Sequence, residues 1–455
     1  MIILFIGCTQ TPSIYRGKGT PSIERKIHEI INKSQLSTNM GIKAVSIQSG
    51  QILIDLNSTS LFNPASNNKI FTAISALALL DTGYTFQTQV RYEENRLYLI
   101  GGGDPDLSLA TLDSLAAIVS DLNLSVDQLI LDDTRHDSIN YGEGWMWDEG
   151  AWWYSAQISA LSVNDNCVDF IINPGNVGEP AQIYTNPQSS YYTIQNKSKT
   201  VNDTSGFEKL IIDRDWQNGT NRFTITGHIV DTTSTDTIYR NVDDPTQFTG
   251  HIFKELIEKK GIKIQTIQKG ETPISAKLIA SHQSNFLPHV VKNLMVESDN
   301  LTAELLIKTI GFESDSVQGN WDNGLIQVRT FLNDIVELDT TTFSMKDGSG
   351  VSRYNYASPN HFIHLLTWAY NHPEIRDQFM FTLPHGGLNG TLEDRNFPET
   401  ILAKTGSLSG VSNLSGYIFN KEDVIAFSIL MNGFTESSDP YRSLQDKIVN
   451  ALSDR

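Results

Sequence analysis

The stretch from Ser66 to Leu80 constrains the fold most strongly, because it is apolar on almost every side. A surface helix carries one apolar stripe, whereas an all-round apolar pattern predicts a helix at the centre of a domain. The stretch also holds Lys69, and residues three apart on a helix share one face. Burial would lower the pKa of that amine towards the range in which it accepts the proton of the Ser66 hydroxyl. Ser-x-x-Lys also arises by chance in a long chain, so the pair needs support from elsewhere.

A second candidate motif is Ser298-Asp299-Asn300. It lies between an apolar run over 286–296 and a helical pattern that begins at Leu301. Taken alone, the motif is also an ordinary start of a helix, since serine, aspartate and asparagine are all favoured N-caps.

A third candidate motif is Lys404-Thr405-Gly406-Ser407, which continues an extended stretch over 400–403. The edge of a strand at this place could offer backbone groups to an extended peptide. We expect Gly406 to let that peptide approach closely, because glycine has no side chain.

The three motifs occur together, in this order, in penicillin-binding proteins and class A β-lactamases. The chain most resembles the class C low-molecular-mass penicillin-binding proteins, from about Pro21 to Leu452. These form the D-alanyl-D-alanine carboxypeptidase/endopeptidase family of the serine β-lactamase/DD-peptidase superfamily. Four further segments carry the likeness. They are Gly-Gly-Gly-Asp-Pro at 101–105, Trp-Met-Trp-Asp-Glu at 145–149, Asp-Gly-Ser-Gly-Val-Ser-Arg at 347–353, and Leu-Pro-His-Gly-Gly-Leu-Asn-Gly-Thr-Leu at 383–392.

The resemblance implies an α+β fold, in which helices flank a DD-peptidase/β-lactamase-like antiparallel sheet built from both chain ends. Ser298 follows Ser66 at a far greater distance than in a β-lactamase, so we expect large, mostly β inserted domains between them. We expect a catalytic domain over 21–84 and 271–455. An outer insert should cover 85–165 and 236–270, and an inner insert should cover 166–235.

The resemblance also implies roles for the motif residues. Ser66 is the nucleophile that attacks the carbonyl of the penultimate D-alanine, and Lys69 is its base. Ser298 relays the proton to the leaving amine. Asn300 holds Lys69 and the substrate amide, and Lys404 keeps the pocket positive and orients Ser298.

Further groups are implied to bind the substrate. The backbone N–H groups of Ser66 and Ser407 form the oxyanion hole. The hydroxyls of Thr405 and Ser407, beside Gly406, are candidates to bind the substrate carboxylate.

Glu149, Tyr154 and Arg353 match the family positions that meet the far end of a diaminopimelate side chain, although the family acid is usually aspartate. The alternative is that four nearby tryptophans only pack a seam between domains: Trp145, Trp147, Trp152 and Trp153.

The first seven residues, Met1 to Gly7, are apolar, and Cys8 follows directly after Gly7. This resembles the end of a bacterial lipoprotein signal, in which the cysteine receives lipid. We expect 1–20 to be a signal remnant and tether, with Cys8 as the lipid anchor of an exported, periplasmic protein. An ordinary signal or a buried strand remain alternatives.

The net charge and the residue types exclude some classes of partner and cofactor. Thirty-four Lys and Arg against 52 Asp and Glu give a net charge of −18, which opposes binding to nucleic acid. The two cysteines cannot form a thiolate cluster, and His361 and His364 sit in an apolar stretch without a metal-binding motif. We therefore expect no metal and no other cofactor.

The sequence thus predicts a serine-type D-Ala-D-Ala carboxypeptidase/endopeptidase that acts on peptidoglycan stem peptides and is acylated by β-lactam antibiotics. A β-lactamase-like hydrolase is the first alternative, although the class A Glu-x-x-Leu-Asn does not occur between Ser66 and Ser298. A non-catalytic cell-wall scaffold is the second, although it would be free to lose the motif residues. An esterase or aminopeptidase on the same framework is the third.

Overall fold

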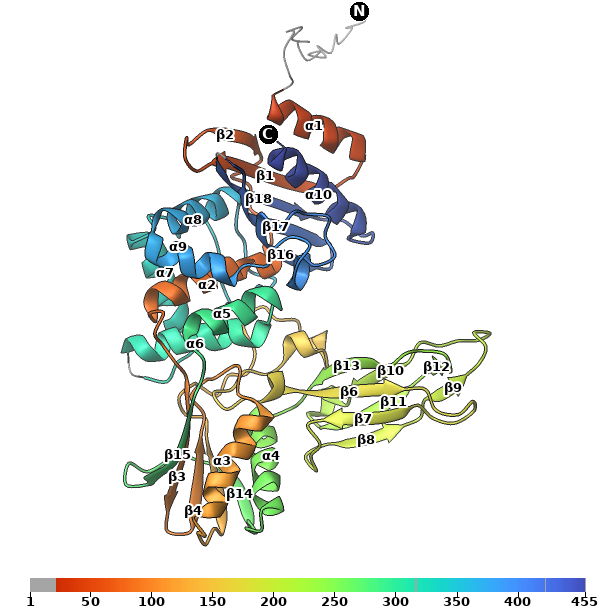
Figure 1. Cartoon of the computed structure of the whole chain (residues 1–455), viewed down its shortest axis with the longest axis vertical. Helices are drawn as coiled ribbons and strands as arrows, with labels where there is room; N and C mark the ends of the chain where they lie inside the picture. Colours follow the sequence, from red (N-terminus) through yellow and green to blue (C-terminus); the bar gives the residue numbers. More distant parts are fainter. Residues whose placement is uncertain (1–21, 316, 422, 455) are drawn as a thin grey trace, which may run out of the picture.

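A five-stranded antiparallel sheet is built from both ends of the chain, as predicted (Figure 1). The computed structural model describes residues 22–315, 317–421 and 423–454. The strand order is β16-β17-β18-β1-β2, and the pairing of β1 with β18 joins the N-terminal and C-terminal segments. The bounds are β1 Asn39–Ser46, β2 Ile52–Leu56, β16 Ile401–Leu408, β17 Val411–Phe419 and β18 Val424–Asn432.

Helices cover both faces of this sheet (Figure 1). On one face, α1 (Ile23–Ser34) packs beside α10 (Asp439–Ser453), and their apolar residues share a core with the sheet. The hydroxyl of Ser22 caps α1 by accepting from the Arg25 N–H. On the other face lie α2 Lys69–Leu79, α5 Leu287–Val296, α6 Asn300–Asp315, α7 Trp321–Asp334, α8 Pro359–Asn371 and α9 Pro373–Thr382.

Helix α2 is the central helix that the apolar pattern predicts, and its residues from Lys69 to Leu77 are all buried. The helix differs from the prediction at its start. A 3₁₀ turn, η1 (Ala65–Asn68), precedes it, so Ser66 lies on this tighter turn and Lys69 is the first residue of α2.

A second five-stranded sheet, in the order β14-β5-β4-β3-β15, forms the outer insert. Its strands and helices are β3 Gln87–Glu93, β4 Arg96–Ile100, α3 Leu109–Asp121, β5 Gln128–Asp132, α4 Pro245–Lys259, β14 Thr266–Lys269 and β15 Lys277–Gln283. The pairs β4–β5 and β5–β14 are parallel, and α3 connects β4 to β5. Because β15 joins this sheet, the outer insert runs past the predicted boundary at 270.

The inner insert consists of short strands, as its turn-rich sequence predicts, and projects to one side of the molecule (Figure 1). They are β6 Cys167–Asn173, β7 Gln182–Asn186, β8 Thr193–Asn196, β9 Lys199–Val201, β10 Ile211–Arg214, β11 Arg222–Thr226, β12 His228–Val230 and β13 Asp236–Asn241. Strand β13 pairs with β6, so the inner sheet continues beyond the predicted end at 235.

The predicted lipid site at Cys8 and the tether up to residue 20 lie outside the described residues. Within the part of the chain that the structure describes, no helix is long and apolar enough to cross a bilayer.

Candidate active site

The structure brings Ser66, Lys69 and Asn300 together at the start of α2. The Nζ of Lys69 lies 3.1 Å from the Oγ of Ser66 and donates to the Oδ1 of Asn300 at 2.5 Å. It also donates to the carbonyl oxygen of Ser349 at 2.9 Å. The amine is thus fully engaged and points at the hydroxyl, which is the geometry that proton transfer between them requires.

Each residue of Ser298-Asp299-Asn300 has a separate task. The carboxylate of Asp299 accepts from the backbone N–H of Thr302 at 2.6 Å and thereby caps α6. Ser298 has a φ of +60°, an uncommon value for a residue with a side chain, and its Oγ accepts from Lys404 at 2.8 Å. The motif is therefore a helix cap, and the same cap presents Ser298 and Asn300 to the site.

Strand β16 lies at the edge of its sheet, as predicted for the segment that carries Lys404. The first part of this edge is covered, because the Gly386 N–H donates to the Ile401 carbonyl and the Ala403 N–H donates to the Pro384 carbonyl. The open part of the edge, from Thr405 onward, borders the cavity described below.

Gly406 allows a close approach within the protein that the sequence did not indicate. A Cβ at this position would lie 2.6 Å from the carbonyl oxygen of Pro64 and 3.0 Å from the backbone nitrogen of Asn67. Glycine therefore lets β16 approach the turn that carries Ser66, and the approach of a bound peptide stays a prediction.

A buried loop that begins at Asp347 supplies the Ser349 carbonyl to Lys69. The carboxylate of Asp347 accepts from the backbone N–H groups of Gly350 and Ser352 and from the side chains of Asn355 and Trp145. These bonds fix the loop at the back of the site. In the sequence, this segment carries only part of the family resemblance, and Asp347 has no predicted role.

Glu304 of α6 is the second buried carboxylate behind Lys69. Its oxygens accept from the backbone N–H groups of Gly348 and Ser349 at 2.8 Å each, and from the Trp321 indole at 2.7 Å. Burial raises the pKa of the Glu304 carboxyl to about 7, with Asp347 adding to the rise. Glu304 thus holds the backbone immediately before the Ser349 carbonyl, which accepts a hydrogen bond from Lys69.

The buried amine of Lys69 loses its proton more readily than the amine of an exposed lysine would. Burial lowers the pKa of its amine to about 8, although Asp299, Glu304 and Asp347 all act to raise it. Lys404 is also fully buried, and both burial and the neighbouring Lys69 lower the pKa of its amine well below the usual value.

One cavity of about 400 Å³ lies at this site, and Lys69, Lys404 and Gly406 are not among its lining residues. Its lining includes the predicted Ser66, Ser298, Asn300, Thr405 and Ser407, and also the softer predictions Glu149, Tyr154 and Arg353. The Tyr154 hydroxyl donates to Glu149 at 2.6 Å, and burial together with Glu149 raises the pKa of this phenol. Further lining residues are Trp153, Gly350, Val351, Thr391, Leu408 and Ser409.

The insert completes the site through its backbone. The Nδ2 of Asn300 donates to the carbonyl oxygen of Tyr154 at 2.7 Å, so the amide must turn its Oδ1 towards Lys69. The Trp145 indole of the same loop donates to Asp347 at 3.0 Å.

Sequence reasoning missed the Tyr154 carbonyl, Asp347 and Glu304. Only the glycines around Asp347 indicated a loop with an unusual backbone.

The predicted seam of tryptophans is present only in part. Trp145 is partly buried and bonded to Asp347, whereas Trp147, Trp152 and Trp153 remain 78%, 48% and 42% exposed.

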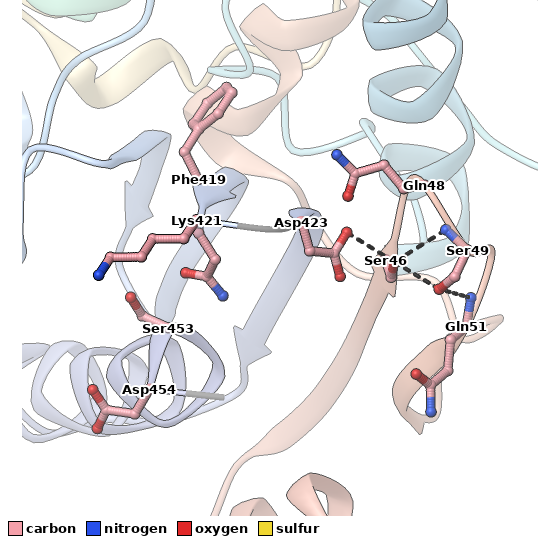
Figure 2. A pocket seen from close by; sticks show the side chains of 10 residues that line it. Ser46, Gln48, Ser49, Gln51, Phe419, Lys421, Asp423, Ser453 and Asp454 are labelled. Carbon is pink, nitrogen blue, oxygen red and sulfur yellow. Dashed lines mark hydrogen bonds between the residues drawn. The ribbon is translucent and has the colours of Figure 1, made fainter.

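A larger hollow of about 830 Å³ lies at the opposite end of β17 from the cavity. Figure 2 shows Ser46, at the end of β1, near Ser49 and Asp423, and all three border this hollow. The Ser46 hydroxyl donates to the Asp423 carboxylate at 2.9 Å and accepts from Ser49, and among the described residues no lysine amine bonds to this hydroxyl. This hollow therefore lacks the arrangement of nucleophile and base that the first cavity has.

Known proteins provide an independent comparison. A model of the D-Ala-D-Ala carboxypeptidase 3 (S13) family matches residues 23–454. The D-alanyl-D-alanine carboxypeptidase of Actinomadura sp. (strain R39) is 34% identical over 443 residues, which cover 91% of this chain and 81% of that protein.

Solved structures agree on the fold. The crystal structure of penicillin binding protein 4 (dacB) from Haemophilus influenzae matches with a TM-score of 0.81 at 24% identity, over 94% of this chain and 99% of that one. A structure of the same protein complexed with a novel β-lactam matches with a TM-score of 0.74 at 23% identity and the same coverage.

Proposed function

Because the chain belongs to the D-Ala-D-Ala carboxypeptidase 3 (S13) family, we propose that Ser66 is the nucleophile of a serine-type D-Ala-D-Ala carboxypeptidase and endopeptidase. Its substrates are the stem peptides of peptidoglycan. The observation that carries this proposal is the 3.1 Å contact between Ser66 Oγ and the buried amine of Lys69.

Acylation begins when neutral Lys69 takes the proton of the Ser66 hydroxyl. The oxygen of Ser66 then bonds to the carbonyl carbon of the penultimate D-alanine. The developing oxyanion is bound by the backbone N–H groups of Ser66 and Ser407, and the loss of one such donor typically costs ~2.7–4 kcal/mol of barrier.

The leaving amine then receives a proton. The bond between carbonyl carbon and nitrogen breaks while Ser298, held by Lys404, passes the proton that Lys69 took from Ser66. D-Alanine leaves, and water attacks the ester to release the shortened peptide and restore the Ser66 hydroxyl. Asn300 holds Lys69 in place during both steps.

The ends of the substrate have separate partners in this proposal. The hydroxyls of Thr405 and Ser407 bind the terminal carboxylate. Glu149, Tyr154 and Arg353 line the same cavity and suit the amine and carboxylate at the end of a diaminopimelate side chain. We assign the protein to the cell-wall compartment outside the cytoplasm, where this substrate lies.

β-Lactams are the covalent inhibitors that this mechanism predicts, because their amide acylates the same hydroxyl. The test is the intact mass of the full chain after benzylpenicillin, on the unmodified protein, on Ser66→Ala and on Ser60→Ala. Ser60 is exposed and serves as a matched control. We expect an adduct on the first and third proteins only.

Two results of this test would contradict the proposal. An adduct on Ser66→Ala would mean that another residue is acylated. Sustained hydrolysis of a chromogenic cephalosporin, in place of one equivalent followed by slow turnover, would favour the β-lactamase-like alternative.

A further inference from the structure

The loop that lines one wall of the cavity also carries aromatic rings that face solvent. Trp147 is 78% exposed, which is unusual for a large apolar side chain that lies beside a cleft. Trp147 belongs to the short helix η2 (Trp147–Glu149), so it lies two residues before the cavity-lining Glu149. The Cα atoms of these two residues are therefore within about 7 Å of each other.

The position of Trp147 is supported from the inner insert. Its ring lies 5.3 Å from that of Trp216, with 51° between the ring planes. Trp216 in turn touches Gly150, where a Cβ would lie 2.9 Å from the indole nitrogen, and the φ of +61° at Gly150 also suits glycine. Two domains thus hold an exposed ring in a defined place.

We call Trp147 and Trp216 the aromatic ledge. Glu149, two residues after Trp147, lines the cavity, and so does Trp153 of the same loop, which is 42% exposed. A ledge this near the peptide cleft is suited to the part of the substrate that lies beyond the peptide.

We propose that the aromatic ledge binds a sugar ring of the glycan strand that carries the stem peptide. The apolar C–H face of a pyranose packs on an aromatic ring, while its polar substituents stay in water. A stem of about five residues spans at most ~17 Å when extended, so its attachment sugar falls at the rim of the cleft rather than within it. This inference rests on peptidoglycan being the substrate.

The charges beside the ledge disfavour a membrane as the occupant. Asp148 is exposed next to Trp147, whereas Asp215, which precedes Trp216, is paired with Arg222 at 2.6 Å. The Asp148 carboxylate, in a chain with a net charge of −18, would be repelled by anionic headgroups but not by a neutral sugar.

Binding of an uncharged glycan tests the proposal. The full chain with Ser66→Ala is titrated with chitotetraose, a neutral oligomer of N-acetylglucosamine, and the affinity is measured by calorimetry. Adding Trp147→Ala or Trp216→Ala should weaken binding about tenfold, which corresponds to ~1.4 kcal/mol. Adding Tyr184→Ala, which removes a 56% exposed ring of β7, should leave the affinity unchanged.

Three results would overturn the proposal. They are no glycan binding by the Ser66→Ala protein, equal affinity with and without Trp147, or Trp147-dependent binding to phosphatidylglycerol vesicles in place of glycan. Thermal unfolding of each variant first shows that it is folded. Release of D-alanine from a free pentapeptide by the unmodified protein is measured in parallel, so a failure of the ledge is distinguished from a failure of the proposed function.

Discussion

At the scale of single residues, the surroundings of Lys69 set the pKa of its amine. Three carboxylates raise the pKa of its amine, yet burial outweighs them and brings it to about 8. An exposed lysine would be charged at neutral pH and unable to accept a proton. The local sequence places the amine near the hydroxyl, and burial gives it the lowered pKa that the proposed role of base requires.

The rate of acylation should therefore rise with pH. Only neutral Lys69 accepts the Ser66 proton, and its neutral fraction grows ~tenfold per pH unit below about pH 8 and levels off above it. Stopped-flow acylation by a chromogenic cephalosporin from about pH 6 to about pH 10 measures this dependence. A rate that is flat over the acidic half of this range would show that Lys69 is not the base.

Glu304→Gln should move that pH profile towards lower pH. The carboxylate of Glu304 raises the pKa of Lys69, so its removal should lower this pKa. The amide also places a donor against backbone N–H groups, which should reduce the free energy of unfolding by ~1–3 kcal/mol.

The matched control for this change is Asp322→Asn, an exposed carboxylate at the start of α7. The pH profile should be the same in this variant as in the unmodified protein. An unchanged profile in Glu304→Gln, measured alongside urea unfolding, would contradict the electrostatic coupling of Glu304 to Lys69.

At the scale of elements, the site depends on the close approach of three backbones. The η1 turn, β16 and the loop that begins at Asp347 meet without side chains between them, because Gly406 and Gly350 stand at the contacts. Gly350 has a φ of +92°, and a Cβ there would overlap the carbonyl oxygen of Ala65.

Gly350→Ala should therefore abolish or strongly slow acylation by benzylpenicillin and reduce thermal stability. Gly178→Ala is a matched control, since its φ is +95° and a Cβ there meets nothing within 4 Å. The left-handed backbone costs each variant ~1–2 kcal/mol of stability. The difference in stability between the two variants therefore reports the overlap with Ala65. Equal stability and equal acylation in the two variants would argue against this contact.

At the scale of the whole molecule, the inserts form part of the candidate active site. The Tyr154 carbonyl sets the orientation of the Asn300 amide, and the Trp145 indole bonds to Asp347. The catalytic domain without its inserts would therefore lack two contacts that hold the residues around Lys69.

Trp145→Phe should test this connection, since it keeps most of the ring and removes the N–H. The loss of a hydrogen bond to a buried carboxylate should lower the free energy of unfolding by ~1.5–3 kcal/mol and slow acylation by benzylpenicillin. Tyr141→Phe is the control, because its hydroxyl accepts from Gln157 within the insert. Comparable acylation in both variants would mean that the contact with Asp347 is dispensable.

The sequence by itself determined the features that are local. The all-round apolar pattern predicts the buried helix, and each of the three motifs can be read within a few residues. Only the tertiary structure decided that β15 joins the insert's sheet, that Gly406 contacts the Ser66 turn, and that Glu304 and the Tyr154 carbonyl stand behind Lys69 and Asn300. The physical reason is that these contacts join residues far apart in the chain, so their burial and bonding arise from packing and leave no local pattern.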